Sequence, residues 1–250
     1  EQVAAVFQRT NIHEQYAAVL TFDYENLNTP IEKTAQHLAK CLKQLELADG
    51  QLTIVAHSMG GLVARYMIEQ EGMQAMVRRL LQAGTPNGGS ELSDFRKKIT
   101  GWLGLAINGV AFMQPYLGIL SLLGKGLEKR IFKTLDQMAP DSAFLSRLNA
   151  AALPDTLSYA LIAGDTNLIK ATLLKKDPMW KKLLKALKQR GLYLFLDYLV
   201  FDNIPNDMAV QVARMKAIPH PGVQVVVIDC NHMMYFSNPD SLQLLQELLD

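Results

Sequence analysis

The sequence predicts an α/β protein built on a mostly parallel sheet that is covered by helices on both faces. Apolar runs with strand character alternate along the chain with segments whose apolar residues recur at helical spacing. One short apolar strand, LTIVA, passes directly into a helix through His-Ser-Met-Gly-Gly. The chain has 250 residues, of which 49% are hydrophobic and 20% charged, enough for a sizeable buried core.

The expected elements follow one another in a regular order. Buried strands that alternate with helices favour a parallel sheet, because each crossover helix returns the chain to the same end of the sheet. We expect strands over 16–23, 52–56, 77–83, 157–163 and 223–228, and helices over 31–47, 59–70 and 241–249. Two apolar, helix-rich segments, about 91–150 and 167–200, interrupt this alternation. The prediction is a single domain over 1–250 with two helical insertions at strand ends, where α/β sheets build their sites.

Composition excludes several classes of partner. The formal net charge is +1, so no general attraction to nucleic acid is expected. Cys41 and Cys230 lie far apart without metal-ligand spacing, and their simplest interpretation is two buried free thiols. They leave the compartment undecided between a cytoplasmic and a peripheral membrane location. Residues 99–124 carry no charge and have the length of a membrane span, but glycines, amides and a proline favour broken amphipathic helices instead.

The segment TIVAHSMGGLVAR, residues 53–65, predicts a sharp corner between a strand and a helix. Such a turn forces Ser58 into a strained backbone conformation and lifts its side chain clear of the sheet. Close packing of helix against strand requires small residues near the turn, and Ala56 and Gly60 meet that demand. The Met59 N–H at the helix start would point toward an anion formed beside Ser58 Oγ. The alternative role for Ser58 is an ordinary helix N-cap.

Three segments carry a resemblance to a known family. AHSMGG resembles the nucleophile elbow of α/β-hydrolase lipases and esterases, whose usual form is G-x-S-x-G, with alanine first in a subgroup of bacterial lipases. LLQAGTPNGGSEL, residues 80–92, resembles the segment after the next strand in these lipases. QMAPDSAFLSRLN, residues 137–149, resembles the segment that returns from their lid. The chain is similar to bacterial lipases and to the inositol-deacylase-like group.

The resemblance implies a serine hydrolase that cleaves carboxylic esters, of lipid or acyl type, through a covalent acyl-enzyme. It implies no metal and no organic cofactor, because a serine, a base and an acid complete the chemistry. A serine acyltransferase would share the same residues. A noncatalytic lipid-binding or scaffold relative is the other alternative.

The base and the acid follow from the chain order Ser, Asp, His of this family. His232 lies after the last expected strand in VVVIDCNHMMYFSNPDSL, which resembles the family's histidine loop. Asp207, in NIPNDMAVQVARM, resembles the family's acid segment and is preferred as the acid, and Asp165 after the preceding strand is the alternative. His57 is adjacent to Ser58, and we expect its side chain to leave the turn in another direction.

The oxyanion hole is expected to need a second N–H besides that of Met59. In the family a His-Gly loop after an earlier strand supplies it, and this chain contains no His-Gly dipeptide. The simplest expectation is that the strand carrying that loop lies upstream of Glu1, so that the hydrolase domain is incomplete at its N-terminus.

The two insertions suggest how substrate is held. The first is rich in large apolar residues, and we expect Trp102, Phe112, Met113 and Tyr116 to form a substrate-binding lid. The second contains KDPMWKKLLKALKQR, residues 176–190, a basic amphipathic pattern typical either of a solvated face or of peripheral contact with an anionic membrane. The oligomeric state is not fixed by the sequence.

Overall fold

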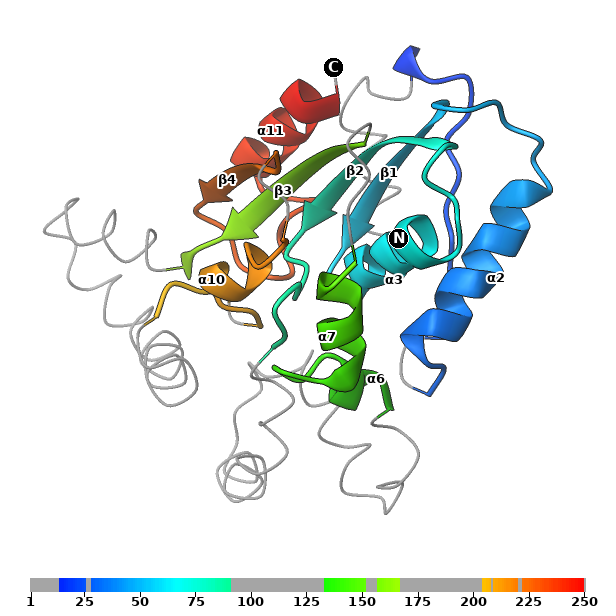
Figure 1. Ribbon diagram of the computed structural model, residues 1–250. Helices are drawn as coiled ribbons and strands as arrows, with labels where there is room; N and C mark the ends of the chain where they lie inside the picture. Colours follow the sequence, from blue (N-terminus) through cyan, green and yellow to red (C-terminus); the bar gives the residue numbers. More distant parts are fainter. Residues whose placement is uncertain are drawn as a thin grey trace, which may run out of the picture.

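The computed structural model describes residues 14–25, 28–90, 133–151, 157–166, 204–207, 209–219 and 222–249 (Figure 1). The helices are α2 (Ile31–Lys43), α3 (Met59–Gln70), α6 (Lys133–Gln137), α7 (Ala143–Asn149), α10 (Val212–Met215) and α11 (Pro239–Leu249). The strands are β1 (Leu52–His57), β2 (Val77–Ala83), β3 (Ser158–Gly164) and β4 (Gln224–Ile228).

The four strands form one parallel sheet in the order β1-β2-β3-β4 (Figure 1). His57 lies opposite Ala83, which in turn lies opposite Ile162, and Gly164 lies opposite Ile228. The carboxyl ends of all four strands therefore meet along one edge. This confirms the predicted α/β class and parallel sheet, with strand bounds that differ from the expected ones by one residue at most.

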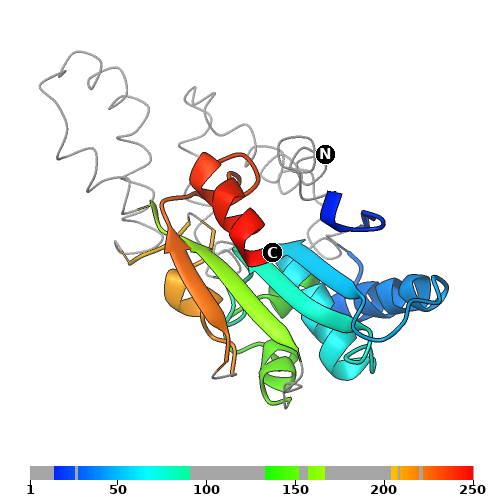
Figure 2. The ribbon, with the colours of Figure 1, turned by 90° about the horizontal axis from the view of Figure 1, so that it is seen from above.

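Helices cover both faces of the sheet, as predicted. Because side chains alternate along a strand, Leu80 and Tyr159 point to the face packed by α2, α3 and α7, and Leu81 and Ala160 point to the face packed by α11. The short helix α10 packs on Leu161, on the same side of β3 as Tyr159. In Figure 2 the sheet is seen between α11 and the helices of the opposite face.

Helix α2 begins directly after Pro30, at the residue expected from the sequence, and ends four residues earlier than expected. Its buried residues recur at helical spacing, namely Ile31, Thr34, Ala35, Ala39 and Leu42, so that one stripe faces α3 and the core. Pro30 offers no side chain to cap the helix, and Gln137 of α6 accepts a hydrogen bond from the Ile31 N–H at 2.9 Å instead.

The predicted strand over 16–23 is wrong. Residues 16–23 contain no strand, and Val19 and Leu20 are 39% and 62% exposed. A strand requires a hydrogen-bonding neighbour, and none of the described strands pairs with this segment. Its aromatic side chains hold it instead: Tyr16 packs against the cluster that contains α11, and Phe22 stacks on Tyr24.

Several expectations fall outside the described residues. These are the lid residues Trp102, Phe112, Met113 and Tyr116, the uncharged segment 99–124, and the second insertion over 167–200. Within the described ranges, no helix combines the length and the apolar character needed to cross a bilayer. In that same part of the chain, no group of three or more His, Cys, Asp or Glu side chains could hold a metal ion.

Candidate active site

Ser58 occupies the turn between β1 and α3 with φ 53° and ψ −129°, a combination that residues with a Cβ rarely adopt. Backbone strain of this kind costs about 1–3 kcal/mol and persists only when the surrounding structure imposes it. Here the Ser58 N–H donates to Ala83 O at 2.9 Å, and the Gly61 N–H donates to Ser58 O at 3.0 Å. The Ser58 hydroxyl makes no capping hydrogen bond to α3, so helix capping does not explain the serine.

The tight contact at the start of α3 falls on Gly61, against the loop after β2, rather than on Gly60. A Cβ on Gly61 would lie 2.0 Å from Thr85 Oγ1, whereas a Cβ on Gly60 would meet only the Tyr24 hydroxyl at 3.3 Å. The expectation that Gly60 provides the close approach is therefore wrong. The first turn of α3 faces the loop after β2 through Gly61, and the second glycine of the AHSMGG segment is the one that the packing requires.

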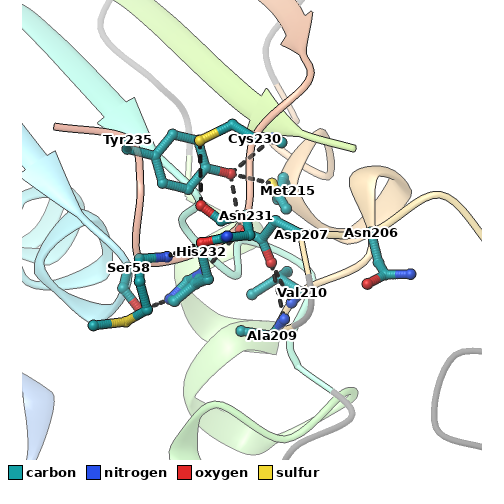
Figure 3. Close-up of polar contacts among 12 residues, drawn as sticks. Ser58, Asn206, Asp207, Ala209, Val210, Met215, Cys230, Asn231, His232 and Tyr235 are labelled. Carbon is teal, nitrogen blue, oxygen red and sulfur yellow. Dashed lines mark hydrogen bonds and ion pairs between the residues drawn. The ribbon is translucent and has the colours of Figure 1, made fainter. Parts of the chain in front are cut away.

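His232 connects Ser58 to Asp207 in one chain of hydrogen bonds (Figure 3). His232 Nε2 lies 2.9 Å from Ser58 Oγ, and His232 Nδ1 lies 2.7 Å from Asp207 Oδ2. An ionised carboxylate can only accept, so Nδ1 carries the proton and Nε2 is free to accept from the serine hydroxyl. The structure thus brings the three residues together from the ends of β1 and β4 and from the connection after β3.

The Asp207 carboxylate is fully buried and accepts four hydrogen bonds. Oδ1 accepts from the backbone N–H groups of Ala209 at 3.0 Å and Val210 at 2.8 Å. Oδ2 accepts from His232 Nδ1 and, at 2.8 Å, from the Tyr235 hydroxyl. Donors of this kind stabilise the negative charge and fix the orientation of the carboxylate.

Asp165, the alternative acid, follows β3 at the same edge of the sheet. Its backbone N–H donates to Ile228 O at 2.8 Å, and the residue is 8% exposed. The His232 ring makes its hydrogen bond to Asp207 instead. The geometry therefore favours Asp207 of the two candidates.

Tyr235 is a site residue that the sequence argument missed. Its hydroxyl accepts a hydrogen bond from the Gly164 N–H at 2.7 Å and donates to Asp207 Oδ2. Burial and the adjacent Asp207 charge raise the pKa of Tyr235 well above its usual value, so the phenol remains a donor. The available signal was an aromatic residue three positions after His232, which by itself does not reveal its partner.

His57 also lies within the site. Its ring centroid is 4.8 Å from that of His232 and 5.7 Å from those of Tyr235 and Phe236. Burial and the neighbouring His232 lower the pKa of His57 to about 4, although its hydrogen bond to His232 and the Asp207 charge oppose this shift. His57 is therefore neutral at physiological pH.

Gly84, which follows β2, provides the space in which the His232–Asp207 pair meets. It has φ 61°, and a Cβ there would lie 2.6 Å from Tyr235 Cε2 and 2.9 Å from Asp207 Oδ2. Its backbone conformation and its surroundings both exclude a side chain, and Gly89 of the same GTPNGG segment is restricted in the same way, with φ 97° and a Cβ that would lie 2.6 Å from Pro140 N.

A buried polar network connects α3, which begins after Ser58, to the elements around it. Arg65 and Glu69 of α3 pair at 2.9 Å with no exposed side-chain surface, and Glu69 accepts from the Tyr159 hydroxyl at 3.0 Å. Arg65 also donates to the side-chain oxygens of Asn87 at 3.1 Å and Asn149 at 2.9 Å. The network therefore ties α3 to the loop after β2 and to the end of α7, and each partner satisfies a group that would be costly to bury alone.

A small, mostly apolar cavity opens beside Ser58 and His232. Its empty volume is about 300 Å³, part of which is open to solvent. The cavity is lined by Ser58, Pro86, Ser90, Leu135, Met138, Ala209, Val210 and His232. Leu135 lies in α6 and Met138 directly after it, so α6 and the start of the segment that resembles the return from a lid supply one wall.

The parallel sheet, the strained serine between strand and helix, and the histidine after the last strand define the α/β-hydrolase fold. The chain belongs to the family described as a domain of unknown function, DUF7379, which matches residues 3–250. None of the curated proteins matches the chain.

Solved structures with the same fold include ester-hydrolysing enzymes. The mature lipase BlEst2 of Bacillus licheniformis is 17% identical with a TM-score of 0.54, and the match covers 89% of this chain and 75% of the lipase. A metagenomic carboxyl esterase is 16% identical with a TM-score of 0.51, over 96% of this chain and 62% of the esterase. The phospholipase PlaB of Legionella pneumophila is 13% identical with a TM-score of 0.53, over 84% of this chain and 41% of the phospholipase. At these identities the likeness establishes the fold.

Proposed function

We propose that this protein is a serine hydrolase that cleaves carboxylic esters through an acyl-enzyme, with Ser58, His232 and Asp207 as its catalytic triad. The observation that carries the proposal is the hydrogen-bonded chain from Asp207 through His232 to Ser58, which ends on a serine held at φ 53°. Serine with a neighbouring base and a buried acid is the arrangement that activates a hydroxyl as a nucleophile.

The reaction proceeds in two halves. Ser58 Oγ attacks the ester carbonyl carbon while His232 Nε2 takes the hydroxyl proton, and His232 then gives that proton to the departing alcohol. Water attacks the acyl-Ser58 ester in the second half, again losing its proton to Nε2, and the carboxylic acid leaves as Ser58 Oγ regains the proton. Asp207 keeps the Nδ1 proton in place and stabilises the imidazolium in both halves.

The Met59 N–H is the proposed donor to the oxyanion. It is the first N–H of α3, and such groups have no partner within the helix. The positive end of the helix dipole adds to this stabilisation. The second donor remains a prediction.

The substrate is proposed to be an ester with an apolar acyl group. The cavity beside Ser58 has an apolar wall formed by Pro86, Leu135, Met138 and Val210. The lipase, esterase and phospholipase of similar fold act on esters. Trp102, Phe112, Met113 and Tyr116 are proposed to extend this surface as a lid. The same proposal includes a likeness to the inositol-deacylase-like group. It also includes peripheral contact of residues 176–190 with an anionic membrane.

Fluorophosphonate labelling of the full-length protein tests the assignment. We expect the wild type to be labelled and Ser58→Ala to be unlabelled. Asp207→Asn is expected to lower the labelling rate and the kcat for a p-nitrophenyl ester by about 10³–10⁴-fold, because the asparagine favours the wrong His232 tautomer. Asp165→Asn is the matched control and is expected to stay within threefold of wild type.

Two results would contradict the proposal. Labelling of Ser58→Ala at the wild-type rate would show that Ser58 is not the nucleophile. Full activity of Asp207→Asn would show that Asp207 is not the acid. A wild-type protein that is neither labelled nor active would favour the noncatalytic alternative. Faster transfer of the acyl group to an added alcohol than to water would instead identify an acyltransferase.

A further inference from the structure

The side chain of His57 is hydrogen-bonded to the main chain of His232. His57 Nε2 lies 2.8 Å from the His232 carbonyl oxygen. A carbonyl oxygen can only accept, so Nε2 carries the proton and Nδ1 does not. His57 immediately precedes Ser58, and this bond therefore joins the nucleophile turn to the loop that carries His232.

A second hydrogen bond holds the other side of the same residue. The His232 N–H donates to the backbone oxygen of Asp207 at 2.7 Å. The main chain of His232 is thus fixed at its N–H by Asp207 and at its carbonyl by His57. The ring of His232 makes the corresponding side-chain bonds to Asp207 and Ser58.

The loop around His232 is anchored further along by the buried side chains of Tyr235 and Phe236, and the Met233 N–H donates to Asn231 Oδ1 at 3.0 Å. Met233 and Met234, the two residues that follow, are 44% and 42% exposed. An imidazole that moves a proton between two partners has to stay within about 0.5 Å of the productive position. The bond from His57 holds the His232 carbonyl, which directly precedes the exposed Met233 and Met234.

We propose that His57 is a positioning residue for the reaction proposed above, holding the His232 main chain through its Nε2–H so that the imidazole stays aligned with Ser58. The proposal rests on the proposed triad, because His57 acts only through the position of His232 and takes no part in the chemistry itself. A neutral His57 suits this task because the adjacent His232 becomes positively charged during each half-reaction, and a second charge at a centroid distance of 4.8 Å would oppose it.

Four variants of the full-length protein distinguish the effect of the N–H donor at position 57 from the effect of the imidazole ring that carries it. Glutamine carries its N–H group three bonds from Cβ, as the Nε2 of histidine does, whereas the amide of asparagine is one bond shorter and cannot reach the His232 carbonyl. His57→Gln and His57→Asn therefore differ in reach and not in polarity. His57→Leu removes the donor altogether, and Ser58→Ala reports the background rate.

Hydrolysis is measured as kcat per active site, with the active fraction counted by fluorophosphonate titration so that partly folded protein does not contribute. We expect His57→Asn and His57→Leu to lower kcat by about 10–100-fold with KM changed less than twofold, since small misplacement of a catalytic group costs this much. His57→Gln is expected to recover most of that loss. Equal kcat values for His57→Gln and His57→Asn, or a His57→Leu kcat within threefold of wild type, would overturn the proposal.

The proton on His232 Nδ1 gives a readout that does not require activity. In proton NMR spectra its far-downfield resonance, assigned by its absence in His232→Gln, is expected in the wild type and His57→Gln. It is expected to be lost through exchange with water in His57→Asn. If the wild type proves inactive while the resonance follows this pattern, the proposed function fails and the positioning role stands. A resonance that persists unchanged in His57→Asn overturns the positioning role, whatever the activity.

Discussion

Removing the Tyr235 hydroxyl tests whether Asp207, the proposed acid, depends on a tyrosine. In Tyr235→Phe the ring still fills its buried place, but Asp207 Oδ2 loses one of its two donors and the Gly164 N–H loses its acceptor. The Asp207 carboxylate keeps the backbone N–H groups of Ala209 and Val210 and the His232 ring. The change therefore removes two hydrogen bonds without opening a large cavity.

Stability should respond more strongly than activity. A hydrogen bond to a charged group contributes about 1.5–3 kcal/mol, and a buried donor left without a partner costs about 1–3 kcal/mol. The same hydroxyl makes both bonds and water enters a buried site poorly, so we expect a loss of about 3 kcal/mol in the free energy of unfolding. We expect kcat to fall by about tenfold or less, because three of the four donors to Asp207 remain.

Urea unfolding monitored by circular dichroism measures this loss as a lower midpoint with an unchanged slope. Tyr66→Phe is the control, because the Tyr66 hydroxyl makes no hydrogen bond within the described residues and its ring stacks on Phe144. We expect that control to change the unfolding free energy by less than about 0.5 kcal/mol. The reasoning is refuted if Tyr235→Phe unfolds within 0.5 kcal/mol of wild type, since the hydroxyl would then not be partnered as the structure shows.

Two further predictions use the same assays. Gly84→Ala is expected to lower kcat by about 100-fold, because its Cβ would displace Tyr235 and Asp207. The control Gly72→Ala, with a similar φ of 72° and no atom within 4 Å of its Cβ, is expected to keep wild-type kcat and lose only about 1 kcal/mol of stability. Equal kcat values for the two variants would contradict this prediction. The free energy of unfolding is expected to fall by about 3 kcal/mol from His57 alone as pH drops from about 6.5 to about 4. The unfolded chain protonates His57 near pH 6.5, whereas in the folded chain burial and His232 lower the pKa of His57 to about 4. Urea unfolding across this range should show a smaller decline for His57→Gln than for wild type, and parallel curves would argue against a buried neutral His57.

The parts of the fold that depend on local pattern were predictable from the sequence. A clear period of apolar residues with turn residues at both ends marks three elements, the strands over 52–57 and 77–83 and the helix over 59–70. Their bounds agree closely with expectation. The segment 16–23 shows the limit of that argument. It has the composition of a strand, but strand formation depends on a neighbour to pair with, and that information is not contained in the segment itself.

The acid could not be chosen from spacing alone. Asp165 and Asp207 both lie in the connection between β3 and β4, and both follow the required order after Ser58. What distinguishes them is a tight backbone turn, in which the Asp207 N–H donates to Val210 O at 3.1 Å and the Val210 N–H donates back to the Asp207 carboxylate. Resemblance to a family segment favoured Asp207, and the three-dimensional path of the return loop is what brings that residue to His232.

The contacts of His57 and Tyr235 escaped the sequence argument for a physical reason that applies to both. A catalytic motif records the residues that meet the substrate, whereas these two side chains contact the residues behind them: a main-chain carbonyl in one case, and a carboxylate oxygen with a backbone N–H in the other. A main-chain partner has no side-chain identity that could appear as a pattern in the sequence, and Asp207 lies 28 residues from Tyr235. An exposed loop that carries a catalytic histidine nevertheless needs anchors outside the motif, and a buried aromatic or imidazole side chain within a few residues of a candidate triad member is where they should be sought.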